Sequence, residues 1–222
     1  MIKRLPKWVE YGAFVLALVA GSVNAIGLLG FEHQSVSHLS GTATLVGTGI
    51  THGQLGEVLH LLGVLLAFLV GAAVSGFLLT GSRLKLGRHY DTLLVLEAAL
   101  LFLAIPALNN QLFFGHYLAS MACGLQNALA TSYSGAILRT THLTGIFTDL
   151  GIMLGSFLRG GNFDRRKAVL FILIILGFIT GGVVGALLYG QWHFAALGVP
   201  GAICLLLAAG YRLYSRLAPA RA

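Results

Sequence analysis

The chain has 222 residues, of which 57% are hydrophobic and only 9% are charged, and its mean hydropathy is +0.86. A soluble domain carries roughly 25% charged residues, so these charges are too few to cover a globule in water, and the surface is predicted to face lipid. The net charge of +7 does not indicate nucleic-acid binding, because the basic residues lie at the ends of apolar runs.

Six apolar runs are long enough to cross a bilayer, whose hydrocarbon core requires about 20 helical residues. In chain order they cover residues 9–30, 58–80, 91–107, 113–136, 167–190 and 193–214. The linkers 34–56 and 139–161 are too apolar for ordinary loops, yet they are rich in Gly, Ser, Thr and His. Each linker is either a full helix or a re-entrant half-helix.

The distribution of charge favours six crossings. Basic residues cluster at 83–88, 159–167 and 212–221, whereas the loops 109–116 and 190–193 contain no Lys or Arg. With six spans and the N-terminus inside, all three clusters lie on the cytoplasmic side, as the positive-inside rule requires. Two further crossings would place the first cluster outside. We therefore predict an all-α integral membrane protein with six spans, two re-entrant or broken half-helices and both termini in the cytoplasm.

The two halves of the chain share three sequence blocks in the same order. Residues 21–25 match 124–128, residues 38–44 match 142–148, and residues 68–74 match 178–184. Each half contains three crossings, and an odd number inverts the second copy relative to the first. We predict a single membrane domain (1–222), formed as a 3+3 inverted repeat of residues 1–107 and 108–222, with its site near the midplane.

The second half carries a family resemblance. Its segment Cys123-Gly-Leu-Gln-Asn-Ala128, followed by Arg-Thr-Thr-His-Leu-Thr-Gly-Ile-Phe-Thr-Asp-Leu-Gly at 139–151, closely resembles the YoaK-like family of bacterial membrane proteins. The resemblance covers nearly the whole chain. It implies a multi-pass protein of the bacterial inner membrane and a role in transport, but no substrate. Asn24 stands where the family carries an aspartate, so a proton role is not transferred to it.

Polar side chains inside apolar segments are the candidate substrate ligands. Asn24, Gln126 and Asn127 carry amides that either bond a neighbouring helix or meet a substrate. A second group lies where each linker would begin a helix: His38, Ser40, Gly41, Thr42, His142, Thr144, Gly145 and Thr148. Helix starts offer unpaired N–H groups and a partial positive charge, which suit a small anion or a polar solute. The alternative is a pair of ordinary Ser/Thr helix caps.

Asp149, His142 and Glu97 are the candidate proton-coupling residues. A carboxylate at membrane depth is costly unless it is paired, protonated or functional, and an imidazole titrates near neutral pH. Asp149 alternatively pairs with Arg139 or Arg159. For Glu97 the alternative is a structural hydrogen bond or a role at an interface.

The sequence contains no nucleophile motif, nucleotide loop or metal-ligand spacing, so neither an enzyme, a cofactor nor a metal site is expected. Cys123 and Cys204 are interpreted as small buried residues. We predict a secondary transporter of a small polar or anionic molecule, with protons as the candidate coupling ion. The alternatives are a passive channel built from paired half-helices and a partner-stabilising membrane subunit. The predicted partners are the lipid bilayer, the solute and, through small residues on the helices, a second copy in a homodimer.

Overall fold

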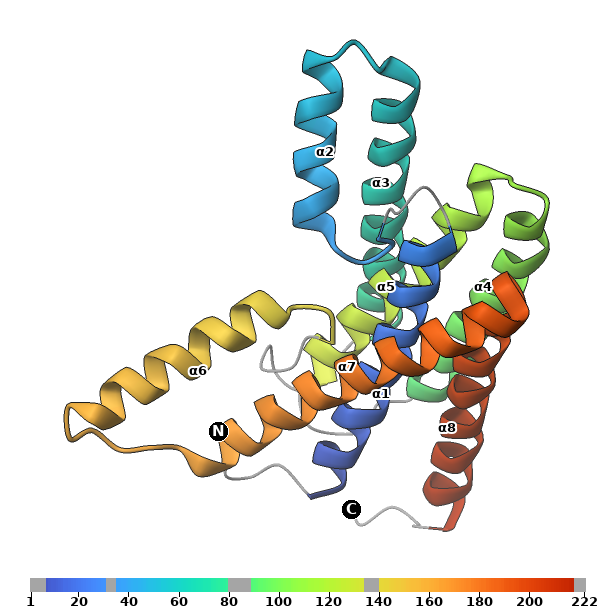
Figure 1. Ribbon diagram of the computed structural model, residues 1–222. Coiled ribbons are helices and arrows are strands. Elements are labelled where there is room, and N and C mark those ends of the chain that lie inside the picture. Colours follow the sequence, from blue (N-terminus) through green and yellow to red (C-terminus); the bar gives the residue numbers. More distant parts are fainter. Residues whose placement is uncertain (1–6, 31–34, 80–88, 134–139, 218–222) are drawn as a thin grey trace.

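The computed structural model describes residues 7–30, 35–79, 89–133 and 140–217, and within these ranges the chain is helical and contains no strand (Figure 1). The helices are α1 (Lys7–Gly30), α2 (Leu39–Thr51), α3 (Leu55–Leu78), α4 (Tyr90–Asn109), α5 (Phe113–Tyr133), α6 (Leu143–Leu158), α7 (Arg165–Trp192), the 3-10 helix η2 (His193–Leu197) and α8 (Gly198–Leu217). The predicted all-α fold class is therefore confirmed.

The six long helices α1, α3, α4, α5, α7 and α8 correspond to the six predicted spans. Four stretches are apolar and long enough to cross a membrane: Glu10–Gly30, Leu55–Leu78, Tyr90–Asn109 and Arg165–Arg216, the last of which contains α7 and α8. α5 is 21 residues long, but His116, Gln126 and Asn127 lower its hydropathy. The chain is thus a membrane-embedded helical protein.

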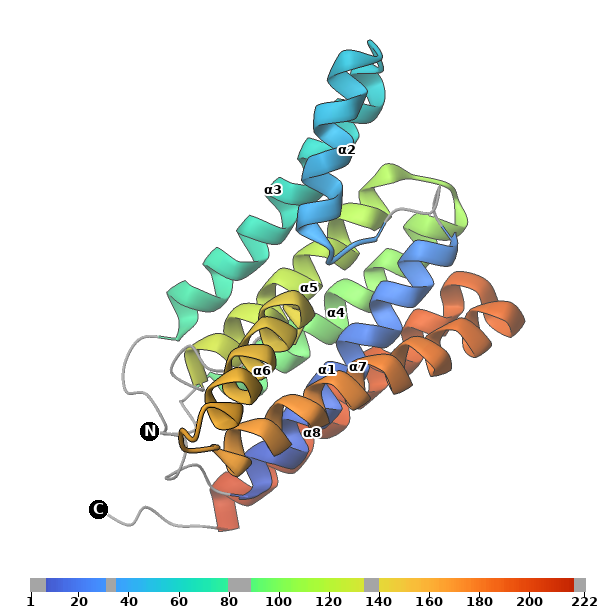
Figure 2. The same cartoon turned by 60° about the vertical axis from the view of Figure 1, so that its left-hand side comes forward.

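Both apolar linkers contain a short helix. α2 has 13 residues and α6 has 16, so at 1.5 Å per residue they reach only about 20 and 24 Å, less than the ~30 Å hydrocarbon core. α2 lies beside α3, and α6 leads back toward α7 (Figures 1 and 2). These lengths favour half-helices over full crossings.

Helix directions follow the predicted alternation. α1 and α5 run in opposite directions (Figure 1), and α1 begins at the same end of the bundle at which α8 ends (Figure 2). The start of α1 and the end of α8 at one end of the bundle agree with an even number of crossings (Figure 2). Which side is cytoplasmic stays a prediction, and the basic cluster at 83–88 lies outside the described residues.

α1 packs closely against α7 through glycine. A β-carbon at Gly21 would collide with the carbonyl oxygen of Phe178, and one at Gly181 would collide with that of Leu18. Ser22 adds a buried hydrogen bond of 2.9 Å to the carbonyl oxygen of Gly181. Because small residues allow the two backbones to touch, dispersion contacts replace the hydrophobic driving force that is absent in lipid.

α3 and α5 repeat this contact. A β-carbon at Gly124 would collide with the carbonyl oxygen of Phe68, and one at Gly71 with that of Met121. These residues occupy the same places in the repeated blocks as Gly21, Phe178, Gly181 and Leu18. The first helix of each half therefore packs on a helix of the other half, as an inverted repeat requires. The boundary between residues 107 and 108 stays a prediction, which these paired contacts favour.

Candidate functional site

Asn24 of α1 holds the segment that leads into α2. Its Oδ1 accepts hydrogen bonds from the Oγ atoms of Ser35 and Ser37, the latter at 2.6 Å, and from the backbone N–H of Ser37 at 3.3 Å. The Oγ of Ser35 also accepts from the backbone N–H of His38 at 3.0 Å. Asn24 thus fixes the position at which α2 begins, which is the interhelical alternative predicted for it.

Gln126, the residue before the repeat counterpart of Asn24, makes a similar contact before α6: its Oε1 accepts a hydrogen bond from Oγ1 of Thr140 at 3.2 Å. The side chain is 1% exposed, and its Nε2 has no hydrogen-bond partner among the described residues. In neighbouring Asn127, the buried Oδ1 is likewise without a partner in the described part of the chain. A buried polar atom left unpaired costs about 1–3 kcal/mol, so a polar ligand at these two atoms would recover that cost.

The two short helices begin in the same way. His38 and His142 are the N-cap residues of α2 and α6, and neither side chain makes a capping hydrogen bond. The imidazole of each folds over a glycine one turn on, His38 against Gly41 and His142 against Gly145. The N-cap residue of each short helix is thus histidine rather than serine or threonine. Both imidazoles are exposed, so the helix starts are accessible.

The hydroxyl groups around these starts are partly engaged by the helices themselves. Oγ1 of Thr42 donates to the carbonyl oxygen of His38 at 3.2 Å, and Oγ1 of Thr148 donates to that of Thr144 at 2.9 Å. Ser40 and Thr144 lie at the second helical positions with exposed side chains. Of the predicted hydroxyl ligands, Ser40 and Thr144 are thus the better placed to meet a solute.

Asp149 of α6 forms an ion pair with Lys167 of α7, with Oδ2 and Nζ 3.1 Å apart. The sequence correctly indicated a basic partner but the wrong one: Arg139 lies outside the described residues, and α7, not the end of α6, supplies the cation. The carboxyl is 45% exposed, so this pair lies at the surface of the protein, away from the buried amides.

Glu97 lies at the centre of the bundle. It is 2% exposed, and its carboxyl is beside the amide of Gln126 on α5 and the thiol of Cys204 on α8. Its Oε2 has no hydrogen-bond partner among the described residues. Cys123 and Cys204 are free and buried, as predicted. The structure therefore joins Glu97 to Gln126, a link that the sequence did not reveal.

The described hydrogen bonds do not join the two helix starts to each other. Those of Asn24 stay in the first half of the chain, and those of Gln126 stay in the second. The predicted midplane site is thus represented by two related polar regions. The second, formed by Gln126, Asn127, Glu97 and the start of α6, contains three buried polar atoms that have no hydrogen-bond partner among the described residues.

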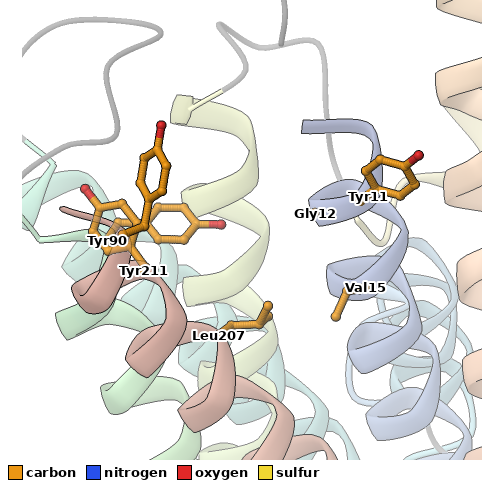
Figure 3. Close-up of a pocket in the computed structure, with 7 residues that line it drawn as sticks. Tyr11, Gly12, Val15, Tyr90, Leu207 and Tyr211 are labelled. Carbon is orange, nitrogen blue, oxygen red and sulfur yellow. The ribbon is translucent and has the colours of Figure 1, made fainter. Parts of the chain in front are cut away.

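A cavity of about 400 Å³ lies elsewhere, between α1, α4 and α8 (Figure 3). It is lined by Tyr11, Gly12, Val15, Tyr90, Leu207, Tyr211 and Tyr214. Nearby, Arg212 pairs with Asp91. Tyrosines concentrate at membrane–water interfaces, so we interpret this region as part of an aromatic belt. It contains none of the predicted site residues.

Sequence reasoning also missed a buried group of histidines. His60 and His116, 56 residues apart in the chain, are hydrogen-bonded to each other, because parallel packing of α3 and α5 aligns their first turns. In the sequence, only the alignment of the repeated blocks pointed to a contact between these two helices.

Comparison with known proteins gives one family. A family model described as "Protein of unknown function (DUF1275)" matches residues 12–210, in agreement with the resemblance noted in the second half. No curated protein and no solved structure matches the chain.

Proposed function

We propose that this chain, which belongs to the DUF1275 family, is a secondary transporter of a small polar or anionic molecule. Its site is formed by Gln126, Asn127 and the start of α6, and the related segment around Asn24 and the start of α2 is the matching half. The family description assigns no activity, so the proposal rests on the chain's own residues.

One observation carries the proposal: two successive residues of α5, one of them bonded to the segment before α6, each have a buried polar atom without a hydrogen-bond partner among the described residues. Nε2 of Gln126 is a buried donor and Oδ1 of Asn127 is a buried acceptor. Through Thr140, Gln126 is tied to the turn that precedes α6, whose first backbone N–H groups lack a side-chain cap. A solute with a carboxylate, or with adjacent hydroxyl and carbonyl groups, could satisfy all three features.

The repeat of the two halves in opposite directions supports a transport function rather than a static binding site. The same elements recur in the first half with opposite direction, and inverted halves allow a protein to expose one site to either side in turn. The glycine contacts of α1 with α7 and of α3 with α5 give the two halves similar, closely packed surfaces along which such motion could occur.

Glu97 is the best-placed candidate for proton coupling. Because its carboxyl lies beside Gln126, a change in its charge would alter the hydrogen bonding of an amide that we assign to the solute. Asp149 is engaged with Lys167, and His142 is exposed at the start of α6. Both stay secondary candidates.

The test begins with a thermal-stability screen of the purified protein against small metabolites and anions at two pH values. A ligand should raise the melting temperature of the wild type and of the control Asn110→Ala, whose amide is exposed and bonded within α4. It should not stabilise Asn127→Ala.

The solute found in this way is then used for uptake into proteoliposomes. Saturable uptake that is lost in Asn127→Ala and Thr144→Ala would support the proposal. Unchanged uptake in both variants would refute the site, and flux that neither saturates nor responds to a proton gradient would indicate the passive channel instead.

A further inference from the structure

His60, His116 and Tyr117 form a buried hydrogen-bonded chain between α3 and α5. Nε2 of His60 lies 3.1 Å from Nδ1 of His116, and Nδ1 of His60 lies 3.1 Å from Oη of Tyr117. The two histidines are 5% and 1% exposed. The ring of Phe113 lies against His60, with the ring centroids 4.3 Å apart. Gly63 leaves room for the Tyr117 ring.

The equivalent contact in the other half contains no such groups. In the register set by the paired glycines, His60 corresponds to Leu170, His116 to Ala13 and Tyr117 to Phe14. Ala13 and Leu170 belong to an apolar cluster together with Ile174. At these three positions apolar packing therefore suffices, whereas the polar contacts of α1 with α7 lie elsewhere along the pair, at Glu10–Arg166 and at Ser22. The ring nitrogens of the α3 and α5 histidines are thus not needed for packing at these positions.

We propose that His60, His116 and Tyr117 are a proton-binding site, in which one proton is held as an imidazolium at His60. In the neutral form, Oη–H of Tyr117 donates to Nδ1 of His60, and Nε2–H of His60 donates to Nδ1 of His116. The added proton forms an N–H bond at Nδ1 of His60, and Tyr117 rotates its hydroxyl to accept from it. No covalent bond breaks, and both hydrogen bonds persist.

The surroundings suit one positive charge. Oη of Tyr117 and Nδ1 of His116 accept from the two N–H groups of the imidazolium, and the Phe113 ring lies within the ~6 Å at which aromatic faces attract cations. A second proton on Nδ1 of His116 would face the N–H of His60 across 3.1 Å and break the chain. The site thus holds a single proton.

Among the described residues, few other ionisable groups lie on the elements packed against this site. Glu57 precedes His60 by one turn on α3, and on the neighbouring helix α2 the nearest titratable groups are His38 and His52 at its two ends. On the helices that pack against α5, Glu97 lies beside Gln126, farther along α5. Asp91 is paired with Arg212 and Glu10 with Arg166. Glu57 is therefore the carboxylate nearest in sequence to the site.

If the chain is a proton-coupled transporter, this site is where the proton is taken up, at the end of the bundle opposite to the start of α1 and the end of α8 (Figure 2). That role rests on the proposed function, whereas the proton site itself does not.

The test is solid-state NMR of the full chain with ¹⁵N-labelled histidine in phosphatidylcholine–phosphatidylglycerol vesicles, from pH 8 to pH 4.5. His60→Gln identifies the signals of His60, and His52→Gln, at an exposed position, is the matched control. As the pH falls, His60 should become protonated at both nitrogens while the protein stays folded. In Tyr117→Phe, which removes one acceptor, the doubly protonated fraction at a fixed pH should fall about tenfold.

A His60 that stays neutral over the whole range would overturn the proposal. A titration that is identical in Tyr117→Phe and wild type would overturn it too, because the chain would then be only a packing contact. Neither result depends on a transported solute, so failure here is distinguishable from failure of the transport proposal.

Discussion

The contacts α1–α7 and α3–α5 have one backbone geometry and two chemistries. In both, glycine lets a carbonyl oxygen of the partner helix approach to where a β-carbon would lie. Beyond the glycines, α1 and α7 meet through Ala13, Leu170 and Ile174, whereas α3 and α5 meet through His60 and His116. The glycines are thus common to both contacts, and the hydrogen-bonded histidines and tyrosine are specific to α3–α5.

This difference distinguishes the residues that are needed for helix packing from those that are candidates for a function. Buried polar groups in a membrane helix must find partners or lose about 1–3 kcal/mol each, so they are costly where alanine and leucine would serve. At the equivalent positions of the α1–α7 contact, Ala13 and Leu170 do serve. The imidazoles of α3–α5 add a property that these apolar residues lack, and proton exchange is the property that imidazoles have.

The largest expected effect comes from the shared glycines. Gly71→Leu and Gly181→Leu should each destabilise the protein by about 3 kcal/mol, because the new side chain meets backbone rather than a movable side chain. Thermal unfolding in detergent would measure this loss. Gly76→Leu and Gly182→Leu are the controls, since nothing lies near a β-carbon at either position. Unequal losses at Gly71 and Gly181 would break the equivalence of the two contacts.

The next effect tests whether the histidine chain is dispensable for packing. His60→Leu alone should lower the free energy of unfolding by about 1–3 kcal/mol, because it removes the hydrogen-bond partner of His116 and Tyr117 at this contact. The triple variant His60→Leu, His116→Ala, Tyr117→Phe copies the α1–α7 residues and should recover most of that loss. Denaturant or thermal unfolding of both variants decides the matter. A triple variant less stable than the single one would mean that the imidazoles are structural.

The comparison also indicates which structural features can be predicted from a sequence of this kind. Apolar runs and repeated blocks predicted the six long helices and the two short ones, since helix length and the cost of exposed backbone in lipid leave few alternatives. Contacts between helices were harder to predict from the sequence. The contact of His60 with His116 was not predicted, because nothing in the local sequence aligns the N-terminal parts of α3 and α5; only close packing at Gly71 and Gly124 does so.

The candidate site was predicted in part, for a similar reason. Asn24, Gln126 and Asn127 stand out as amides in apolar helices, and the segments after them as polar helix starts. That Gln126 lies beside Glu97 depends on how α4 rotates against α5, which many combinations of small and apolar residues would allow. The ion pair of Asp149 was expected, but its partner depends on how α6 returns toward α7.

A third prediction concerns the two halves of the polar site. Glu97 has no carboxyl counterpart in the second half, so we expect the step that couples the proton to the solute site to depend on this single carboxyl. Glu97→Gln keeps the size and the hydrogen bonding, and it should retain solute binding in the thermal screen. Accumulation driven by a proton gradient should fall at least about tenfold, which corresponds to 1.4 kcal/mol. Undiminished proton-driven accumulation by Glu97→Gln in proteoliposomes would exclude it as the coupling group.

The smallest effect distinguishes the two short helices. α6 is tied to α7 by the ion pair of Asp149 with Lys167, whereas the residue of α2 that corresponds to Asp149 is the exposed Leu45. Asp149→Leu, which copies the first half, should change stability by less than about 1 kcal/mol, because partly exposed ion pairs contribute little. Thermal unfolding at low and high salt measures this, with Asp164→Ala, the N-cap of α7, as a nearby comparison. A loss of several kcal/mol in Asp149→Leu would mean that α6 depends on this pair for its position, and that the two short helices are anchored by different means.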